Sequence, residues 1–370
     1  MVCSGMRGLR ENDKIAHGSA GQIFRCAQGW NLWQTLFSME IERLRQLLPA
    51  FSSKRILVIG DVMLDEFIWG KVSRISPEAP VPVVEVTGES AYPGGAANVA
   101  RNLRAFCADA LVMGVVGTDR HAESLRTLLL DLGLGLDSLI AEDSFQTIVK
   151  TRIVARHQQM VRVDREKITP APPARLALAL SQLEKILPTV DAVIFEDYAK
   201  GFLTQEFVDL ATARILAAGK IVTADPNPQN PIAWRGLTAI KPNRTEAFRC
   251  ANIVESDPET DFLPNSQLTL VSQCLLEKWQ AEYLLITLGE QGMVLFEKNR
   301  APYHIPTQAR EVYDVSGAGD TAIALFTLAL AAGATAREAA EISNHASSVV
   351  VGKLGTATLT PGELTDSFIR

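Results

Sequence analysis

The chain has 370 residues, 47% of them hydrophobic, and carries a formal net charge of −6. This acidic balance argues against a protein that coats nucleic acid, so an anionic ligand must be met by local basic residues. No apolar run approaches the roughly 18 residues that a membrane-spanning helix needs. The five cysteines show no CxxC spacing, which is typical of a reduced, cytoplasmic protein and argues against a zinc site or a disulfide framework.

We expect residues 1–38 to be a disordered tail or an over-extended gene prediction, because they mix glycine, serine and basic residues without a period. Met39 is the expected natural start. It begins an amphipathic helix that we expect to end at Pro49. Residues 39–370 show no internal repeat and no linker, which favours one large α/β domain with a small appendage.

Strand-like and helix-like segments alternate along most of this domain. Alternation of this kind predicts a doubly wound, mostly parallel sheet with helices on both faces. Two further segments, at about 65–90 and 147–164, read as antiparallel strands outside the main sheet, and predict a small β flap, or lid. A lid over a crevice excludes water and can pair with a second subunit. Main strands are expected at 55–61, 111–116, 192–195, 221–224 and 283–287, and helices at 121–132, 173–187, 204–218 and 265–279.

Polar residues stand where parallel strands should end, at the edge of the sheet that faces a ligand crevice. Asp61 closes the first strand and is either a ligand for hydroxyl groups or an ordinary turn aspartate. Gly94 and Gly95 lead into a helix whose first turn carries Asn98. These glycines either let the backbone approach a ligand or pack the helix tightly. Lys200 follows another buried strand in the same way.

The lid segment 147–164 is basic. Alternation puts Lys150 and Arg152 on one face of their strand, where they can form a clamp for a substrate phosphate. Solvated side chains on an edge strand are the alternative interpretation of the same two residues.

Asn243 and Glu246 lie three residues apart at the start of a predicted helix. This spacing is typical of a capping box. Glu246 can also hold Mg²⁺ through water, because Mg²⁺ keeps most of its hydration and needs only one or two carboxylates.

A glycine turn, Gly317-Ala318-Gly319, opens directly into an uncharged helix, and Asp320 lies in its first turn. The free N–H groups and the helix dipole make such a turn a seat for a phosphate. A carboxylate beside an anion site suggests a base that takes a proton from an attacking hydroxyl. The alternative is a simple aspartate N-cap. The catalytic interpretation would fail if the Asp320 side chain were buried, or aimed away from the cavity bounded by the first strand and the Gly-Gly helix.

Residues further along the chain can line a nucleotide slot beside this turn. There is no Walker A sequence, so the turn at 317–319 would have to hold the phosphates. The candidates are Thr287, Gly289 and Gly292 in a turn between strands, Asn344 on the penultimate predicted helix, and residues 349–356.

Four motifs in this order resemble those of the ribokinase-like (PfkB) carbohydrate kinases, over about residues 40–366. They are GGAAN at 94–98, DYAKG at 197–201, NRTE at 243–246 and DVSGAGDT at 314–321. The resemblance implies a ribokinase-like fold, with ATP and Mg²⁺ as cofactors and a monovalent cation as a further candidate. By the same resemblance Asp320 is the base, the turn at 317–319 is the anion hole, Asn243 and Glu246 contact Mg–ATP, and Asp61, Gly95 and Asn98 hold the sugar.

Within this family the stretches 60–65, 72–83, 289–293 and 349–356 most resemble kinases of D-glycero-β-D-manno-heptose 7-phosphate, the kinase half of the bifunctional ADP-heptose synthesis protein. This implies transfer of the ATP γ-phosphate to the anomeric hydroxyl, which gives heptose 1,7-bisphosphate for the lipopolysaccharide inner core. Three positions depart from the family pattern: Ser316 replaces threonine, Asn227 replaces the lysine of Asp-Pro-Lys, and Ala199 replaces glycine. Another sugar, sugar phosphate or nucleoside is therefore the alternative acceptor.

A non-catalytic sugar or nucleotide sensor on the same fold is an alternative of a different class. The chain lacks the GxGxxG fingerprint of a dinucleotide oxidoreductase. It also ends without the His-x-Gly-His signature of a nucleotidyltransferase, so we expect a kinase only. The expected partners are a small-molecule sugar phosphate and ATP, with no nucleic acid and no membrane, and the lid favours a homodimer.

Overall fold

The computed structural model describes residues 39–369 except 108, 157, 170, 256–265, 310 and 354. The extension expected at residues 1–38 lies outside the described residues. The chain from Glu40 to Arg370 forms one compact unit.

A nine-stranded sheet forms the centre of this unit, in the order β13-β12-β11-β10-β9-β8-β1-β4-β5. Its pairs are parallel from β11 through to β5, and antiparallel only where β12 and β13 are added at one edge. The doubly wound, mostly parallel sheet predicted from the sequence is confirmed. The strands are β1 Arg55–Gly60, β4 Asp109–Val116, β5 Leu139–Ala141, β8 Ala192–Glu196, β9 Ile221–Asp225, β10 Ala239–Ile240, β11 Tyr283–Thr287, β12 Met293–Glu297 and β13 Tyr303–Ile305.

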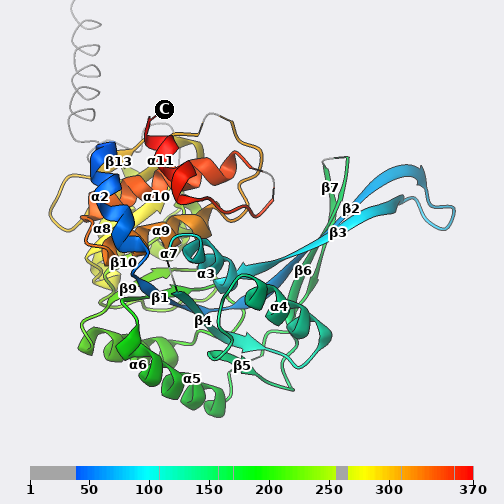
Figure 1. Ribbon diagram of the computed structural model, residues 1–370, viewed down its shortest axis with the longest axis horizontal. Coiled ribbons are helices and arrows are strands. Elements are labelled where there is room, and N and C mark those ends of the chain that lie inside the picture. Colours follow the sequence, from blue (N-terminus) through cyan, green and yellow to red (C-terminus); the bar gives the residue numbers. More distant parts are fainter. Residues whose placement is uncertain are drawn as a thin grey trace, which may run out of the picture. The chain divides into compact units, whose positions relative to one another are not determined.

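Helices cover both faces of this sheet (Figure 1). One face packs against α5 to α8 in a single apolar core, and α3, α9 and α10 lie on the other side (Figure 1). Strands such as β8 are buried along their whole length, which is the pattern that a sheet covered on both faces produces. The helices are α2 Ile41–Phe51, α3 Ala96–Arg104, α4 Arg120–Asp131, α5 Pro173–Ile186, α6 Gln205–Ala217, α7 Arg244–Ala251, α8 Gln267–Trp279, α9 Ala318–Ala331, α10 Ala336–Val351 and α11 Pro361–Ile369, with short 3₁₀ turns at η1 Leu187–Thr189 and η3 Gly289–Gln291.

The first of these helices is longer than the sequence predicted. We expected it to end at Pro49, but α2 continues to Phe51. Proline already has a helical φ, and the buried side chains of Leu47 and Phe51 hold the last turn against the body of the protein. Phe51 packs edge-on against Phe106, with ring centroids 6.3 Å apart. Tertiary packing therefore outweighs the helix-ending tendency of the proline.

A second sheet of four strands, in the order β3-β2-β6-β7, contains the segments expected to form the lid. The antiparallel pairing expected for the lid is right for β2–β3 and β6–β7 but wrong for β2–β6, which pair in parallel because both strands run outward from the carboxyl edge of the central sheet. The strands are β2 Val62–Ile75, β3 Pro82–Gly95, β6 Ile148–Ala155 and β7 Gln158–Arg165. The far ends of β2, β3, β6 and β7 project away from the helices (Figure 1). β2 follows directly from β1, and β3 runs directly into α3, so the lid and the central sheet meet at the residues that the sequence singled out.

Candidate active site

The first turn of α9 presents unpaired N–H groups. Gly317 is the N-cap residue, with φ at 79°, a left-handed value that favours glycine. A Cβ on Gly317 would lie 3.0 Å from Asn98 Nδ2, so the turn packs directly on α3. Within the described part of the chain, no acceptor reaches the N–H groups of Gly319 and Asp320. The turn can therefore accept an anion, as the sequence pattern indicates.

The Asp320 side chain lines a cavity of about 570 Å³ and is only 6% exposed, so it is buried but not aimed away from open space. The expectation about this cavity is wrong in one respect: its lining residues come from the strand ends after β8, β9, β10 and β11 and from α7 and the α9 turn, not from β1 or α3. Its Oδ2 accepts a hydrogen bond of 2.6 Å from Asn98 Nδ2, and its Oδ1 accepts one of 2.8 Å from the Tyr198 hydroxyl. Burial raises the pKa of Asp320, and these two hydrogen bonds partly oppose that rise. The simple N-cap interpretation is wrong, because Gly317 is the N-cap residue and no side chain caps α9.

Three strand ends of the central sheet bring further charged groups to the same cavity. Glu196 ends β8, Asp225 ends β9, and Lys241 directly follows β10. Lys241 Nζ lies 2.7 Å from Asp225 Oδ2. Burial raises the pKa of Asp225 to about 7, although Lys241 acts in the opposite direction. Glu196 Oε2 is buried and has no hydrogen-bond partner among the described residues.

Sequence reasoning did not select Tyr198, Asp225 or Lys241 as site residues. Each is either the last residue of a buried parallel strand or one of the two residues that follow it. The carboxyl ends of such strands meet at one edge, so applying the strand-end rule to β8, β9 and β10 together would have found all three.

The same cavity is also lined by the predicted nucleotide-binding residues Asn243, Glu246, Thr287 and Gly289. Asn243 and Glu246 do form the capping box of α7, so the structural interpretation of their spacing is confirmed. Both also line the cavity, so capping and ligand contact are compatible here.

Two other predicted nucleotide-binding residues do not line this cavity. A Cβ on Gly292 would lie 2.1 Å from the carbonyl oxygen of Ile305, so this glycine permits close packing between β12 and the end of β13. Asn344 is buried on α10, where its Nδ2 donates a hydrogen bond of 2.8 Å to the carbonyl oxygen of Pro306.

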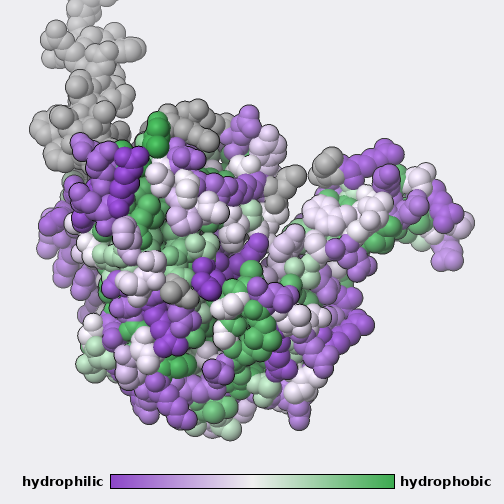
Figure 2. Space-filling model, in the orientation of Figure 1, coloured by the Kyte–Doolittle hydropathy of each residue, from purple (hydrophilic) through white to green (hydrophobic). Residues whose placement is uncertain are grey.

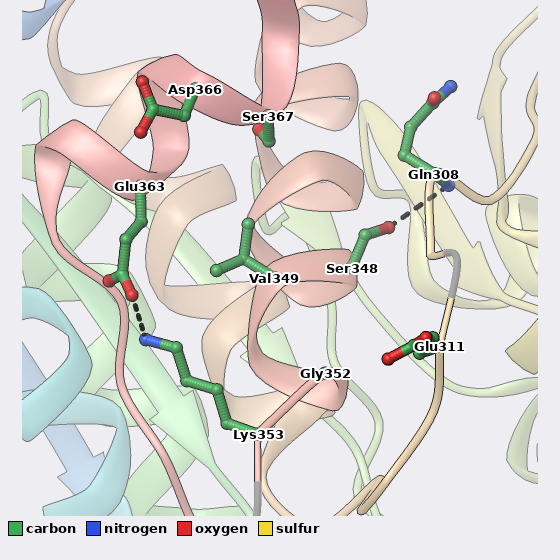
Figure 3. Close-up of a pocket in the computed structure, with 9 residues that line it drawn as sticks. All are labelled: Gln308, Glu311, Ser348, Val349, Gly352, Lys353, Glu363, Asp366 and Ser367. Carbon is green, nitrogen blue, oxygen red and sulfur yellow. Dashed lines mark hydrogen bonds and ion pairs between the residues drawn. The ribbon is translucent and has the colours of Figure 1, made fainter. Parts of the chain in front are cut away.

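A second cavity, of about 460 Å³, contains part of the predicted slot at residues 349–356. It lies between α10, α11 and the segment after β13 (Figure 3). Lys353 pairs with Glu363 across it at 2.6 Å, and Ser348 accepts a hydrogen bond from the Gln308 N–H (Figure 3). None of the predicted catalytic residues lines it.

The Asp61 carboxylate is directed at the backbone of the loop that follows β8. It accepts three hydrogen bonds, from the N–H groups of Tyr198 at 3.1 Å, Lys200 at 2.8 Å and Phe202 at 3.1 Å. Asp61 therefore positions the loop whose Tyr198 hydroxyl contacts Asp320.

The predicted glycines at the start of α3 are tightly packed. A Cβ on Gly94 would lie 2.2 Å from Asp65 Oδ2, and one on Gly95 would lie 2.3 Å from the Asp61 carbonyl oxygen. Gly95 also has a φ of 59°. Close packing of the Gly-Gly turn on the end of β1 brings Asn98, which is 2% exposed, to Asp320.

The predicted substrate-binding cations all have carboxylate partners. Lys150 Nζ lies 3.1 Å from Asp164 and 3.2 Å from Glu166, and Lys200 Nζ lies 2.8 Å from the other oxygen of Glu166. Glu166 therefore joins the lid strand β6 to the loop that follows β8.

Arg152 is the third predicted cation, and it pairs with Asp65 at 2.5 Å. Lys150 and Arg152 are two residues apart on β6, so their side chains lie on the same face of the lid. Lys150 is level with Asp65 on β2, and Arg152 is level with Phe67, further from the central sheet.

The carboxylates around Lys241 fit a hydrated Mg²⁺. No group of three or more potential metal ligands is preassembled among the described residues. Mg²⁺ does not need one, because it keeps several waters and binds one or two carboxylates together with substrate phosphates. Glu246, Asp225 and the unpaired oxygen of Glu196 all line the cavity and supply such oxygens.

Comparison with known proteins identifies the family. The model of the pfkB family carbohydrate kinases matches residues 53–362. The chain belongs to the pfkB family of carbohydrate kinases. It is an enzyme that transfers a phosphoryl group to an alcohol.

Curated relatives and solved structures agree with this assignment. The chain is 40% identical over 327 residues to Bifunctional protein HldE of Desulfatibacillum aliphaticivorans, which covers 88% of this chain and 65% of the relative. It is 43% identical over 325 residues to Bifunctional protein HldE of Caulobacter vibrioides, again with 88% and 65% covered. The chain thus spans a little under two thirds of the length of these relatives.

The fold is that of ribokinase and of phosphofructokinase-2. The structure of Arabidopsis thaliana ribokinase complexed with ribose and ATP superposes with a TM-score of 0.65 at 17% identity, over 85% of this chain and 99% of that one. Escherichia coli phosphofructokinase-2 in complex with substrates and products gives a TM-score of 0.67 at 17% identity, over 85% and 98%. In the described part of the chain, every helix is too short or too polar to cross a bilayer.

Proposed function

We propose that this kinase transfers the γ-phosphoryl group of ATP to the anomeric hydroxyl of D-glycero-D-manno-heptose 7-phosphate and forms heptose 1,7-bisphosphate, a step toward ADP-heptose and the lipopolysaccharide core. The sequence resemblance to heptose 7-phosphate kinases and the identity of 40% or more to proteins named HldE support this substrate.

The observation that carries the proposed mechanism is the position of Asp320. Its carboxylate lies beside the N–H groups of the α9 turn and is fixed by Asn98 and Tyr198. In the proposed reaction Asp320 accepts the proton of the attacking sugar hydroxyl, while the N–H groups of Gly319 and Asp320 stabilise charge on the phosphoryl group. The low exposure of the carboxylate excludes bulk water, which would otherwise compete as acceptor.

The substrate phosphate would bind where Lys150 and Lys200 converge on Glu166. In this proposal the phosphate dianion takes the place of the carboxylate between the two ammonium groups. Arg152, Asn98, Asp61 and the Gly94–Gly95 turn would shape the sugar part of the site.

The nucleotide would bind over the α9 turn, along the cavity lined by Asn243, Glu246, Thr287 and Gly289. Gly292 and Asn344 would not touch the nucleotide but would hold in place the chain around Ile305 and Pro306. Glu246 would hold Mg²⁺ through water, and the ion would neutralise charge on the ATP phosphates. We also propose a monovalent cation as an additional cofactor.

We further propose a cytoplasmic homodimer that forms through the lid. The lid strands expose the large hydrophobic side chains of Trp69, Val86, Val161 and Val163. Hydrophobic residues lie among hydrophilic ones on the face of the projecting arm that Figure 2 shows. Exposed apolar side chains on an extended sheet favour pairing with a second copy. Analytical ultracentrifugation should show a dimer, and a monomer at all micromolar concentrations would contradict this arrangement.

The substrate is tested by measuring ADP release with heptose 7-phosphate, fructose 6-phosphate and ribose under the same conditions. We expect the highest kcat/KM with heptose 7-phosphate. A higher value with another acceptor would replace the substrate but keep the kinase mechanism. Absence of ADP release with all three would mean that the acceptor is a different sugar, sugar phosphate or nucleoside.

A further inference from the structure

Another cavity, also of about 460 Å³, lies between the lid and α4. α4 packs against β2 and β3 beside the base of the lid (Figure 1). Side chains alternate along a strand, so Glu66 and Thr151, which are register partners on β2 and β6, face away from Asp65 and Lys150. The cavity therefore lies on the outer face of the lid, and it shares no lining residue with the active-site cavity.

Three nitrogen-bearing side chains line this outer cavity: Arg120 and His121 in the first turn of α4, and Arg165 at the end of β7. Arg120 and Arg165 form no ion pair with any described residue, although Arg165 donates a hydrogen bond of 3.0 Å to the Thr151 hydroxyl. Both arginines are exposed, so a ligand from solution can reach them. The cations on the inner face of the lid are instead each paired with a carboxylate.

The other lid strands bring acceptors to the same cavity, Glu66 from β2 and Glu89 from β3. Glu66 Oε2 accepts a hydrogen bond of 2.7 Å from the Thr151 hydroxyl, so it does not neutralise Arg165. Guanidinium groups bind phosphate through paired N–H donors, and carboxylates accept hydroxyl groups. A cavity of this volume that offers both kinds of group suits a small phosphorylated ligand.

We propose that the outer cavity binds a phosphate dianion between Arg120 and Arg165, either free phosphate or the phosphate group of a sugar phosphate. Arg120 belongs to the body of the protein and Arg165 to the lid, so a bound phosphate would link these two parts. The residue after Arg165 is Glu166, which pairs with Lys150 and Lys200 on the inner side. The outer site and the proposed substrate clamp would thus share one segment of chain, but the outer site does not depend on which sugar is the acceptor.

The test is calorimetry on protein whose other proposed phosphate sites are blocked. Lys150→Gln/Lys200→Gln removes the proposed substrate clamp, and a saturating non-hydrolysable ATP analogue with Mg²⁺ occupies the α9 turn. Ribose 5-phosphate or inorganic phosphate is then titrated into this protein. The titrations are repeated with Arg120→Gln/Arg165→Gln added, and with Arg126→Gln added as the control, because Arg126 also lies on α4 but does not line the cavity.

We expect one molecule to bind per chain. Arg120→Gln/Arg165→Gln should weaken binding at least about 100-fold, since each charged donor contributes about tenfold or more, and Arg126→Gln should change it less than about twofold. Tighter binding of ribose 5-phosphate than of inorganic phosphate would support the site and identify a sugar phosphate as its ligand, whereas equal or weaker binding would support it with free phosphate as the ligand. No binding of either probe, or equal losses in the cavity variant and the control, would overturn the proposal.

Hydrogen exchange locates the bound probe independently. Ribose 5-phosphate should slow amide exchange in β7 and in the first turn of α4, and slowing only elsewhere would overturn the proposal. If the variant with both arginines replaced does not fold, Arg120→Gln alone takes its place, because Arg120 is exposed and forms no ion pair with a described residue. The proposal then requires a loss of affinity of at least about tenfold.

Discussion

Asp61 should stabilise the active site by holding the loop that follows β8. Its carboxylate accepts the N–H groups of Tyr198, Lys200 and Phe202, and the side chain is 2% exposed. Asp61→Ala leaves three N–H groups without an acceptor, each at a cost of about 1–3 kcal/mol, or about 3–9 kcal/mol in total. In a domain of this size roughly 1 kcal/mol lowers Tm by about 1.5 °C, which gives an expected fall of roughly 4–13 °C.

The same substitution should also release Tyr198 from Asp320, so kcat should fall together with Tm. Asp61→Asn should be milder, because the amide oxygen can keep the bonds from Tyr198 and Lys200 while the amide nitrogen faces the Phe202 N–H. Differential scanning calorimetry and ADP release on both variants measure these effects.

Asp119 provides a matched control. Its carboxylate also accepts three backbone N–H groups, from His121, Ala122 and Thr147, but it lies at the start of α4 and does not line the active-site cavity. Asp119→Ala should lower Tm, by less because the side chain is partly exposed, and should leave kcat unchanged at a temperature where the protein is folded. An unchanged Tm in Asp61→Ala, with only the KM for sugar raised, would refute the loop-positioning role and make Asp61 a direct sugar ligand.

Three other predictions use matched pairs of residues. Tyr198→Phe removes a hydrogen bond that lowers the pKa of Asp320, so the acidic limb of the pH profile of kcat/KM should move to higher pH. The control is Tyr303→Phe, which removes a hydrogen bond of 2.7 Å to Glu341 outside the active-site cavity and should leave the profile unchanged. Glu166→Gln removes the carboxylate that competes with the substrate phosphate, so KM should fall for a phosphorylated sugar and stay constant for ribose; equal changes for both would contradict the proposed clamp. Asn243→Ala and Thr335→Ala each remove a capping box and should each cost about 0.5–2 kcal/mol of stability, but only the first should raise the KM for ATP in steady-state assays. A raised KM in both variants would assign Asn243 a capping role alone.

Much of the fold was predictable because the signals are local. Buried strands such as β8 are short apolar runs, and the glycine turn before α9 can be recognised from its sequence. The capping box of α7 depends on residues only three apart. Local signals of this kind survive folding because tertiary packing reinforces them.

The contacts that assemble the site were not predictable in the same way. The Tyr198 hydroxyl reaches Asp320 across 122 positions of sequence, and Asp61 finds its N–H partners 137 to 141 positions away. Sequence placed Asp61 at a strand end but could not show which donors its carboxylate meets. The Lys241–Asp225 pair likewise depends on the adjacency of β9 and β10, which only the strand order provides.

The proposed mechanism depends above all on Asp320 as the base at the mouth of an N–H-lined phosphate site. Its most direct test is pre-steady-state phosphoryl transfer by Asp320→Asn, together with the affinity of this variant for ATP. We expect the rate of transfer to fall by at least about 100-fold, as loss of a general base does, while ATP affinity is almost unchanged. Near-wild-type transfer by this variant would contradict the mechanism.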